Sequence, residues 1–358
     1  MKKILFICPY PAGLAPSQRF RFEQYLNQLN EKGFYIVVKP FFTDKAYSAF
    51  YQSGNLLSKI HAIAKSYFNR CQLLFQVSSF DFIFIHREAS PLGPPILEYI
   101  IARVLRKKII FDFDDAIWLT DKTCESTLAK HFRWRSKVGS ICKWSYKVSC
   151  GNQYLADYSG KFNSNVVINP TTIDTTHLHL PRVPDKISTD KVTIGWTGSH
   201  STLKYLKTIV PVLQSLEKKY PDIEFLVIAD EDPQLNLNNY SFRPWNKETE
   251  IQDLARMDIG IMPLPNDPWT QGKCGFKALQ YMALCIPAVI SPIGANREVL
   301  DDGIEGYWCI TESEWFKHLE ELILNPDRII EMGAKGRQKV MDHYSVESNT
   351  STFLSLFQ

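Results

Sequence analysis

The stretch Trp269-Thr-Gln-Gly-Lys-Cys-Gly-Phe-Lys-Ala-Leu-Gln-Tyr-Met-Ala283 decides the fold class, together with the apolar run Pro287-Ala-Val-Ile-Ser291 that follows it. A polar loop with two glycines leads into a helix-patterned segment, and a short apolar run comes directly afterwards. This run is apolar on both faces, as in parallel strands that helices cover on both sides. These residues therefore predict a loop, helix and strand of an α/β protein.

The same alternation continues in both directions along the chain. Predicted strands cover residues 3–8, 35–40, 80–85, 108–113, 147–150, 166–168, 192–196, 224–229, 259–262 and 288–291. Predicted helices include residues 19–29, 92–105, 203–219 and 276–284. Strands that alternate with helices in this way form doubly wound parallel sheets. The predicted fold class is α/β.

This rhythm breaks between residues 169 and 190, where polar residues and prolines replace the apolar periodicity. We therefore predict a linker at 171–190 between two Rossmann-like domains, at 1–170 and 191–340. Residues 341–358 are expected to form a C-terminal helix that packs back on the first domain. In doubly wound sheets ligands bind at the carboxyl ends of the strands. Functional residues are therefore expected in the loops after strands, facing a cleft between the domains.

The composition excludes several classes of protein. Of 358 residues 45% are hydrophobic, and 41 Lys and Arg against 38 Asp and Glu leave a formal charge of +3. A disordered or fibrous chain and a dedicated nucleic-acid coat are thereby excluded. No apolar run reaches the roughly 18 residues of a spanning helix, and Pro9 and Pro11 end the signal-like start. The eight cysteines form no C-x-x-C pair, so buried thiols without a disulfide or metal are expected.

The lysines and glycines of the stretch 269–283 predict an anion-binding site. If the helix begins near Lys273, then Lys273, Lys277 and Gln280 lie on one face. Lysines in a first helical turn oppose the positive end of the helix, unless an anion bound there gathers N–H and ammonium groups. Gly272 and Gly275 would let the backbone approach such an anion. The alternative is two solvated lysines on a surface helix.

A second loop of small residues follows the predicted strand at 192–196, in Gly195-Trp-Thr-Gly-Ser-His-Ser-Thr-Leu-Lys204. The hydroxyl groups could simply cap the helix that follows. Alternatively, the turn at Gly198, Ser199 and Lys204 holds a diphosphate.

Three carboxylates, Asp112, Asp114 and Asp115, cluster at the carboxyl end of the predicted strand at 108–113, in Ile109-Ile-Phe-Asp-Phe-Asp-Asp115. Like charges this close need a cation, a shared proton or open water. A solvated loop, a general base, an orienter of sugar hydroxyls and a metal or phosphoryl site all remain open.

The region 269–308, with Leu279-Gln-Tyr-Met-Ala283, Pro287-Ala-Val-Ile-Ser291 and Gly294-Ala-Asn-Arg-Glu-Val-Leu-Asp-Asp-Gly303, resembles the donor site of family 4 glycosyltransferases. These are retaining enzymes of the GT-B fold, with two Rossmann-like domains. The first half is similar to the same group in its opening strand, in Ser17-Gln-Arg-Phe-Arg-Phe-Glu23 and in the aspartate cluster. The resemblance covers nearly the whole chain.

The chain departs from the family at the residues that address the donor. The two family glutamates fall on Gly272 and Gln280, so Gln280 can bond a ribose hydroxyl but supplies no charge. The usual arginine falls on Ser199, whereas its lysine partner matches Lys204. We therefore expect Lys273 or Lys277 to supply the missing positive charge to the diphosphate.

The resemblance also implies further site residues. Trp245 is expected either to stack on the base or to pack in the core, and Gly275 and Glu298 are expected near the sugar. The acceptor would meet residues of the first domain: Arg19, Arg21, His86, Arg87 and Glu88. Basic and aromatic residues at 56–75 and 130–147 suit an anionic membrane surface, unless they are ordinary helices packed on a sheet.

Together these features predict a retaining glycosyltransferase that uses a nucleoside-diphosphate sugar and needs no metal or cofactor. The expected acceptor is a glycan or lipid-linked glycan of cell-surface polysaccharide or glycolipid synthesis. Asp112, Asp114 or Asp115 would orient the acceptor or the sugar hydroxyls. The expected location is the cytoplasm, with peripheral association at the inner face of the cell membrane and no nucleic-acid partner. The alternatives are a non-catalytic sugar-nucleotide-binding protein, a GT-B sugar-nucleotide epimerase and a phosphatase of the haloacid dehalogenase type.

Overall fold

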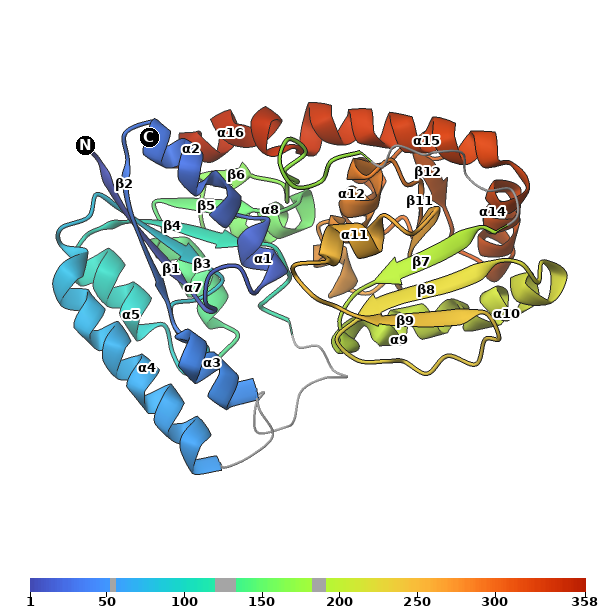
Figure 1. Cartoon of the computed structure of the whole chain (residues 1–358). Helices are drawn as coiled ribbons and strands as arrows, with labels where there is room; N and C mark the ends of the chain where they lie inside the picture. Colours follow the sequence, from blue (N-terminus) through green and yellow to red (C-terminus); the bar gives the residue numbers. More distant parts are fainter. Residues whose placement is uncertain (52–55, 120–132, 182–190) are drawn as a thin grey trace. The chain divides into compact units, whose positions relative to one another are not determined.

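The structure is a computed structural model that describes residues 1–51, 56–119, 133–181 and 191–358. The chain divides into two compact units: Met1–Thr171 with Asn349–Gln358 forms unit 1, and Thr172–Ser348 forms unit 2. Each unit holds a six-stranded sheet whose paired strands all run parallel (Figure 1). The predicted α/β class is therefore confirmed. Residues 182–190 of the predicted linker lie outside the described residues.

The sheet of unit 1 sends alternate side chains to opposite faces, as in any strand. Phe6 faces a cluster with Phe22 and Phe357, whereas the next residue, Ile7, faces Leu73 of the covering helix α4 (Leu56–Val77). Helices therefore bury both faces of the sheet. The strand order is β2 (Tyr35–Pro40), β1 (Lys3–Cys8), β3 (Phe82–His86), β4 (Lys108–Phe113), β5 (Lys147–Cys150) and β6 (Val166–Ile168).

Two predicted helices of unit 1 are shorter or more broken than expected. The helix predicted at 92–105 begins only at Ile96, because Pro94 and Pro95 keep the residues before them out of helical geometry. The helix predicted at 19–29 is split where Arg21 and Phe22 turn into the core. The helices are α1 (Pro16–Arg19), η1 (Glu23–Tyr25), α2 (Leu26–Glu31), α3 (Asp44–Tyr51), α4 (Leu56–Val77), α5 (Ile96–Tyr99), η2 (Ile100–Val104), α7 (Lys137–Trp144) and α8 (Gln153–Gly160).

The C-terminal residues Asn349–Gln358 complete unit 1, together with most of α16 (Val346–Ser355). Phe353 stacks on Tyr25 with ring centroids 4.3 Å apart, and Phe357 lies 6.2 Å from Phe84. Both phenylalanines are fully buried. The end of the chain is thus part of the core of unit 1.

The sheet of unit 2 has two edge strands, β9 and β12, that the sequence pattern does not predict. Its order is β12 (Gly306–Trp308), β11 (Ala288–Ile290), β10 (Ile259–Met262), β7 (Thr193–Thr197), β8 (Glu224–Ala229) and β9 (Tyr240–Pro244). A large apolar core joins the sheet to α10 and α14. Helix α12 packs against β10 and β11.

The segment predicted as one helix at 203–219 is a series of short helical pieces. Pro211 lies at the start of α10, where its missing N–H and fixed φ favour a new helix over continuation of the old one. The helices of unit 2 are η3 (His200–Thr202), α9 (Leu203–Leu206), η4 (Lys207–Ile209), α10 (Val210–Lys219), α11 (Glu250–Leu254), η5 (Thr270–Gly272), α12 (Phe276–Ala283), α13 (Asn296–Val299), α14 (Glu312–Leu324), α15 (Pro326–Lys339) and η6 (Val340–Tyr344).

The described part of the predicted linker is not an exposed tether. Ile173 is fully buried and forms an isolated bridge with Ser345, and His179 is also fully buried. Arg337 donates to the backbone carbonyls of Thr175 and His179. Part of the polar backbone of this segment forms internal hydrogen bonds. Its polar composition therefore did not mean that the whole segment is exposed to solvent.

The described cysteines are free thiols. Cys8, Cys142, Cys150, Cys274 and Cys309 are buried. Burial raises the pKa of the Cys8 thiol to about 12, which keeps it protonated and unreactive. Cys71 departs from the expectation, because it is exposed on α4. Cys124 lies outside the described residues.

Candidate functional site

The turn after β7 can be built only with glycine at position 198. A Cβ atom there would collide with the ring of Trp196 and lie 2.7 Å from Thr202 Oγ1. The Gly198 N–H donates to the Ile228 carbonyl at 3.0 Å, which ties the turn to the end of β8. The turn is therefore packed tightly on the indole of Trp196.

Hydroxyl groups of this turn bond to one another. The Ser199 N–H donates to Thr202 Oγ1 at 3.1 Å, and Ser199 Oγ lies 2.9 Å from Ser201 Oγ. The capping interpretation is thus realised at Ser199. Lys204 lies half-buried on the short helix α9, with its Nζ 5.0 Å from the ring centroid of Tyr205.

The second loop corrects the predicted placement of its lysines. Helix α12 begins at Phe276, because Gly275 adopts a left-handed backbone (φ 68°) that ends the preceding loop. Lys273 precedes this break in extended conformation (ψ 140°), so it does not share a helical face with Lys277 and Gln280. A Cβ atom at Gly275 would lie 2.6 Å from Val299 Cγ2, which adds a steric need for glycine.

Trp196 brings the two loops together. The ammonium of Lys277 lies over the Trp196 indole, 5.2 Å from its centroid, and the same indole packs against Gly198. The ammonium of Lys273 lies 5.4 Å from the Trp269 ring. Cation–π attraction to an indole face helps to hold a lysine ammonium in place. Lys277 and the small-residue turn therefore contact the same indole.

Glu250 is a site-region residue that the sequence reasoning missed. This side chain is 5% exposed, and its Oε1 accepts from Gln280 Nε2 at 3.3 Å and from Trp245 Nε1 at 3.4 Å. Trp245 is half-buried, and its backbone N–H donates to the Ala229 carbonyl at the end of β8. In the sequence Glu250 looks like an ordinary acidic residue in a first helical turn. Its distance of five residues from Trp245 is the only sequence signal for the contact.

The other predicted donor residues are peripheral to these contacts. Gly272 is buried in η5, where its N–H donates to the Trp269 carbonyl at 3.1 Å. Glu298 is exposed on α13, and its backbone carbonyl accepts from the Tyr344 hydroxyl at 3.0 Å.

In unit 1, Asp112 belongs to a buried network rather than to an open site. Its carboxylate accepts from Arg21, from Ser149 Oγ at 2.6 Å and from His86 Nδ1 at 2.8 Å. The side chains of Asp112, Arg21 and His86 are fully buried. Burial alone would raise the pKa of Asp112, but the charge of Arg21 and the hydrogen bond from His86 hold it well below its usual value.

This burial corrects three predicted site residues. Asp112, Arg21 and His86 do not reach the surface of the structure, because β4 and its neighbours carry them inside the covered sheet. Arg19 is also buried, with its guanidinium 4.9 Å from the Phe20 ring centroid. The charges of Asp112 and Arg21 compensate each other within the core instead of addressing a ligand.

The remaining predicted residues of unit 1 form a partly exposed cluster at the ends of β3 and β4. Arg87 donates to Asp114 at 2.7 Å and to Asp115 at 2.5 Å, and these three side chains are 13–22% exposed. Arg87 has a left-handed backbone (φ 60°), which is strained for a residue other than glycine. Glu88 pairs with Lys137 at 2.8 Å. Asp114 and Asp115 are therefore the carboxylates that a ligand could reach.

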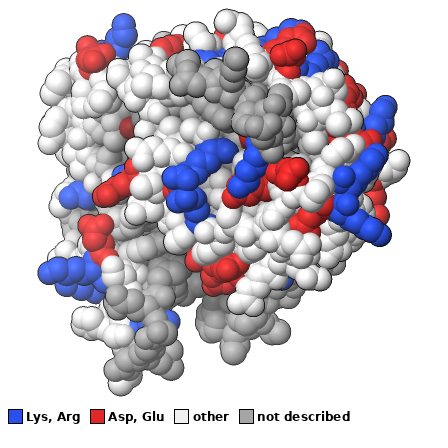
Figure 2. All heavy atoms as spheres, turned by 45° about the vertical axis from the view of Figure 1, so that its right-hand side comes forward, with Lys and Arg blue, Asp and Glu red and all other residues white. Residues whose placement is uncertain are grey.

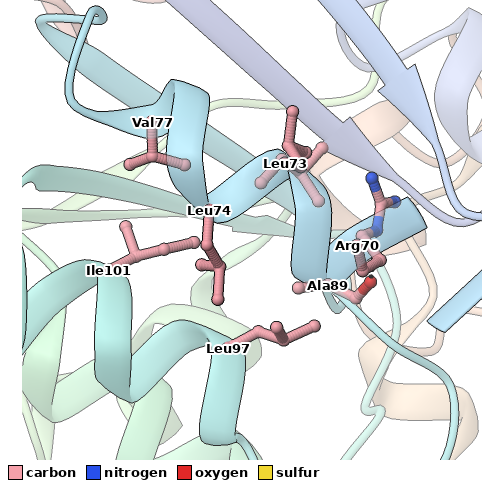
Figure 3. A pocket seen from close by; sticks show the side chains of 8 residues that line it. Arg70, Leu73, Leu74, Val77, Ala89, Leu97 and Ile101 are labelled. Carbon is pink, nitrogen blue, oxygen red and sulfur yellow. Dashed lines mark hydrogen bonds between the residues drawn. The ribbon is translucent and has the colours of Figure 1, made fainter. Parts of the chain in front are cut away.

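Two further features carry no site. A small pocket of unit 1 (Figure 3) is apolar except for Arg70, whose guanidinium donates to the carbonyls of Cys8, Lys39 and Ala89. It is a packing gap between α4, η2 and the sheet. Across the described residues, His, Cys, Asp and Glu form no group suited to a metal ion.

On the face in Figure 2, basic and acidic side chains are interspersed, in keeping with the small net charge.

Comparison with solved structures defines the class of the fold. Three similar structures are sucrose-phosphate synthase from Thermosynechococcus elongatus (12% identity, TM-score 0.73, covering 100% of this chain and 98% of that chain), a glycosyltransferase from Rickettsia africae (12%, 0.69, 99% and 97%) and Anabaena HepE in complex with UDP-glucose (13%, 0.67, 99% and 99%). At these identities the likeness shows the fold. The predicted GT-B fold is confirmed.

The family assignment comes from the sequence of unit 2. Residues 191–325 match the family model described as glycosyl transferases group 1. The predicted resemblance to these enzymes is confirmed over this part of the chain. No curated protein matches the sequence.

Proposed function

We propose that this protein is a retaining glycosyltransferase that moves a sugar from a nucleoside-diphosphate sugar to a glycan or lipid-linked acceptor. Unit 2 would bind the donor and unit 1 the acceptor, in the synthesis of cell-surface polysaccharide or glycolipid. One observation carries the proposal: within the group 1 domain, Lys277 and the Gly198 turn meet on the indole of Trp196. The complex of HepE with UDP-glucose supports a donor of the same class.

The proposed chemistry needs positive charge at the diphosphate. When the bond from the sugar to the diphosphate breaks, the leaving group gains negative charge, and donors fixed beforehand stabilise it most. The contact of Lys277 with the indole that also packs against Gly198 supports this role for Lys277, and Lys273 and Lys204 would add further positive charge. Trp245 would contact the base and Gln280 the ribose. In retaining members of the resembling family, the acceptor attacks the donor sugar from the same face that the diphosphate leaves. A strong enzymatic base is therefore not required.

In unit 1 we assign the acceptor to the cluster of Arg87, Asp114 and Asp115. Carboxylates that share one guanidinium keep lone pairs for sugar hydroxyl groups. The cluster is partly exposed, unlike the Asp112 network. Asp114 and Asp115 would therefore orient acceptor hydroxyls.

A binding panel tests the donor site. The melting temperature of the full chain is measured with UDP, GDP, ADP and their sugar conjugates, with and without Mg²⁺. Ligand that binds the folded state raises the melting temperature by mass action. We expect one diphosphate to stabilise the wild type without metal, Lys277→Ala to lose this shift, and Lys207→Ala, an exposed lysine of η4, to keep it. No shift with any nucleotide would contradict the proposal.

The departures at Gly272 and Gln280 favour one other candidate, a sugar-nucleotide-binding protein without transferase activity. Such a protein would give the same panel of thermal shifts. Incubation with the stabilising nucleotide sugar and a lipid extract separates the two candidates. Transfer of labelled sugar supports the enzyme, and binding without transfer or hydrolysis supports the alternative.

We also propose that unit 1 rests on an anionic membrane through α4. This 22-residue helix contains no Asp or Glu, and it exposes Phe75 (86%), Leu57 (73%) and Phe68 (61%) to solvent. Lys65 is exposed on the same helix and Lys59 is half-buried. Exposed aromatic and aliphatic side chains beside lysines suit the headgroup region of anionic lipid. No helix in the described ranges is long and apolar enough to span a bilayer.

Vesicle binding tests the membrane proposal. We expect the full chain to sediment with vesicles of phosphatidylglycerol and phosphatidylcholine but not with phosphatidylcholine alone. Phe68→Ser with Phe75→Ser should abolish sedimentation, whereas Phe162→Ser, an exposed phenylalanine after α8, should not. Equal sedimentation of both variants would exclude α4 as the contact.

A further inference from the structure

Glu250 joins two residues to which nucleoside contacts are assigned. It is the first residue of α11, and its Oε1 accepts from Gln280 on α12 and from Trp245 in the loop after β9. Glu250 is 5% exposed and Gln280 is 2% exposed. Three separate segments of unit 2 therefore meet at one buried carboxylate.

The chemistry of the two groups fixes how Gln280 is turned. An ionised carboxylate only accepts hydrogen bonds, whereas a carboxamide donates through its nitrogen and accepts through its oxygen. The contact with Glu250 therefore exists in one orientation of the amide, with Nε2 toward Glu250 and Oε1 turned away.

We propose that Glu250 is a positioning residue for nucleotide recognition. By holding Nε2 of Gln280, it presents Oε1 as a fixed acceptor to a ribose hydroxyl of the nucleoside diphosphate. This inference rests on the proposed donor-binding function of unit 2. It accounts for a glutamine at a site where the resembling family has a glutamate. The negative charge lies on Glu250, which contacts Gln280, and the Gln280 amide oxygen is the acceptor that would face the ligand.

The test measures how much the ribose hydroxyls contribute to binding. Dissociation constants of the full chain are measured by calorimetry for UDP, GDP and ADP and for their 2′,3′-dideoxy counterparts. A hydrogen bond of ordinary strength predicts that the wild type binds the hydroxylated form about tenfold more tightly. In Glu250→Gln the neighbouring amide no longer dictates the orientation of Gln280, so this ratio should fall toward one. Glu248→Gln removes the same charge from an exposed residue of the same loop and should keep the ratio.

Exchanging the two side chains gives the second arm. Gln280→Glu alone places two carboxylates at a distance of about 3.3 Å and should weaken binding through repulsion. Adding Glu250→Gln restores a donor–acceptor pair in reverse, so the double variant should recover affinity and the tenfold ratio. Recovery of this kind is not expected if Glu250 only supports the fold.

The outcomes separate this inference from the function on which it rests. A wild type that binds none of the diphosphates overturns the donor site and the inference with it. A wild type that binds them but ignores the ribose hydroxyls overturns only the inference. So does an unchanged ratio in Glu250→Gln, or a double variant that binds no better than Gln280→Glu.

Discussion

The two units use charged residues near the same structural location, the carboxyl ends of parallel strands, in opposite ways. In unit 1, Asp112 and His86 stand at the ends of neighbouring strands and are fully buried with Arg21. In unit 2, Lys273 and Lys277 lie beside indole rings and remain partly accessible. The first set is buried together with its partners, whereas the ammonium groups of the second set lie over aromatic rings.

The comparison shows that position after a strand does not by itself make a charged residue functional. A buried charge must be paired, because the cost of removing it from water is large. A lysine over an aromatic face is held in place by cation–π attraction and can stay partly accessible. Burial therefore distinguishes the two sets of charged residues better than their position after a strand does.

The largest expected effect is on the stability of unit 1. Asp112→Ala leaves Arg21 buried without its carboxylate, which we expect to cost about 3–5 kcal/mol in the free energy of unfolding. Asp114→Ala removes a carboxylate that is only partly buried and should cost less than about 1 kcal/mol. Urea unfolding of both variants gives the comparison. Equal losses would mean that the two carboxylates do not differ in role.

The same network predicts an acid sensitivity. Because the pKa of folded Asp112 lies well below the unfolded value of about 3.9, its contribution is present above that value and is lost as the pH falls toward the folded pKa. The free energy of unfolding of Asp112→Asn should therefore fall less steeply below pH 4 than that of the wild type. Asp114→Asn serves as the control. Parallel curves for Asp112→Asn and the wild type would refute the charged network.

A smaller effect is expected at the loop that sets the start of α12. Gly275→Ala forces a side chain into a left-handed backbone and against Val299, at a cost of about 1–3 kcal/mol. Gly160→Ala, at the end of α8 with open space around it, should be neutral or slightly stabilising. Thermal unfolding measures both. Gly275→Ala should also weaken nucleotide binding, and wild-type stability and affinity in this variant would contradict the described loop.

The smallest effect concerns the turn of unit 2. The hydrogen bond to the Asp230 carboxylate raises the pKa of His200, so the pair stabilises the fold below the unfolded pKa of about 6.5 and loses this effect as the pH rises through the folded pKa. The wild type should therefore exceed Asp230→Asn in melting temperature at pH 6 but not at pH 9. Because both side chains are largely exposed, we expect a small difference. The opposite pH trend would contradict the pairing.

Much of the fold could be predicted from the sequence, because runs such as Lys3–Cys8 are apolar on both faces, which is typical of buried parallel strands. The edge strands Tyr240–Pro244 and Gly306–Trp308 could not, since the first is only half-buried and the second has only three residues. Helix continuity was also misjudged at Pro211, where a new helix begins within an unbroken apolar pattern.

The candidate site was predicted only as far as its loops. Gly198 and Lys277 stand out through local sequence, but their common contact with Trp196 depends on tertiary structure. The burial of Asp112 depends on Arg21, which lies 91 residues away in the sequence. Glu250 was missed for the same reason, because its partner Gln280 is 30 residues away. Spacing alone cannot report such pairs.

Hydrogen–deuterium exchange of the full chain, with and without the nucleoside diphosphate that binds most tightly, tests the central contrast most directly. We expect the bound nucleotide to slow hydrogen–deuterium exchange at residues 195–204, 245–254 and 269–284 of unit 2. Exchange at residues 82–88 and 108–115 of unit 1 should not change. The same protection should vanish in Lys277→Ala. Protection at residues 108–115 without protection at 269–284 would contradict the account, because the nucleotide would then bind at the aspartates instead of the lysines.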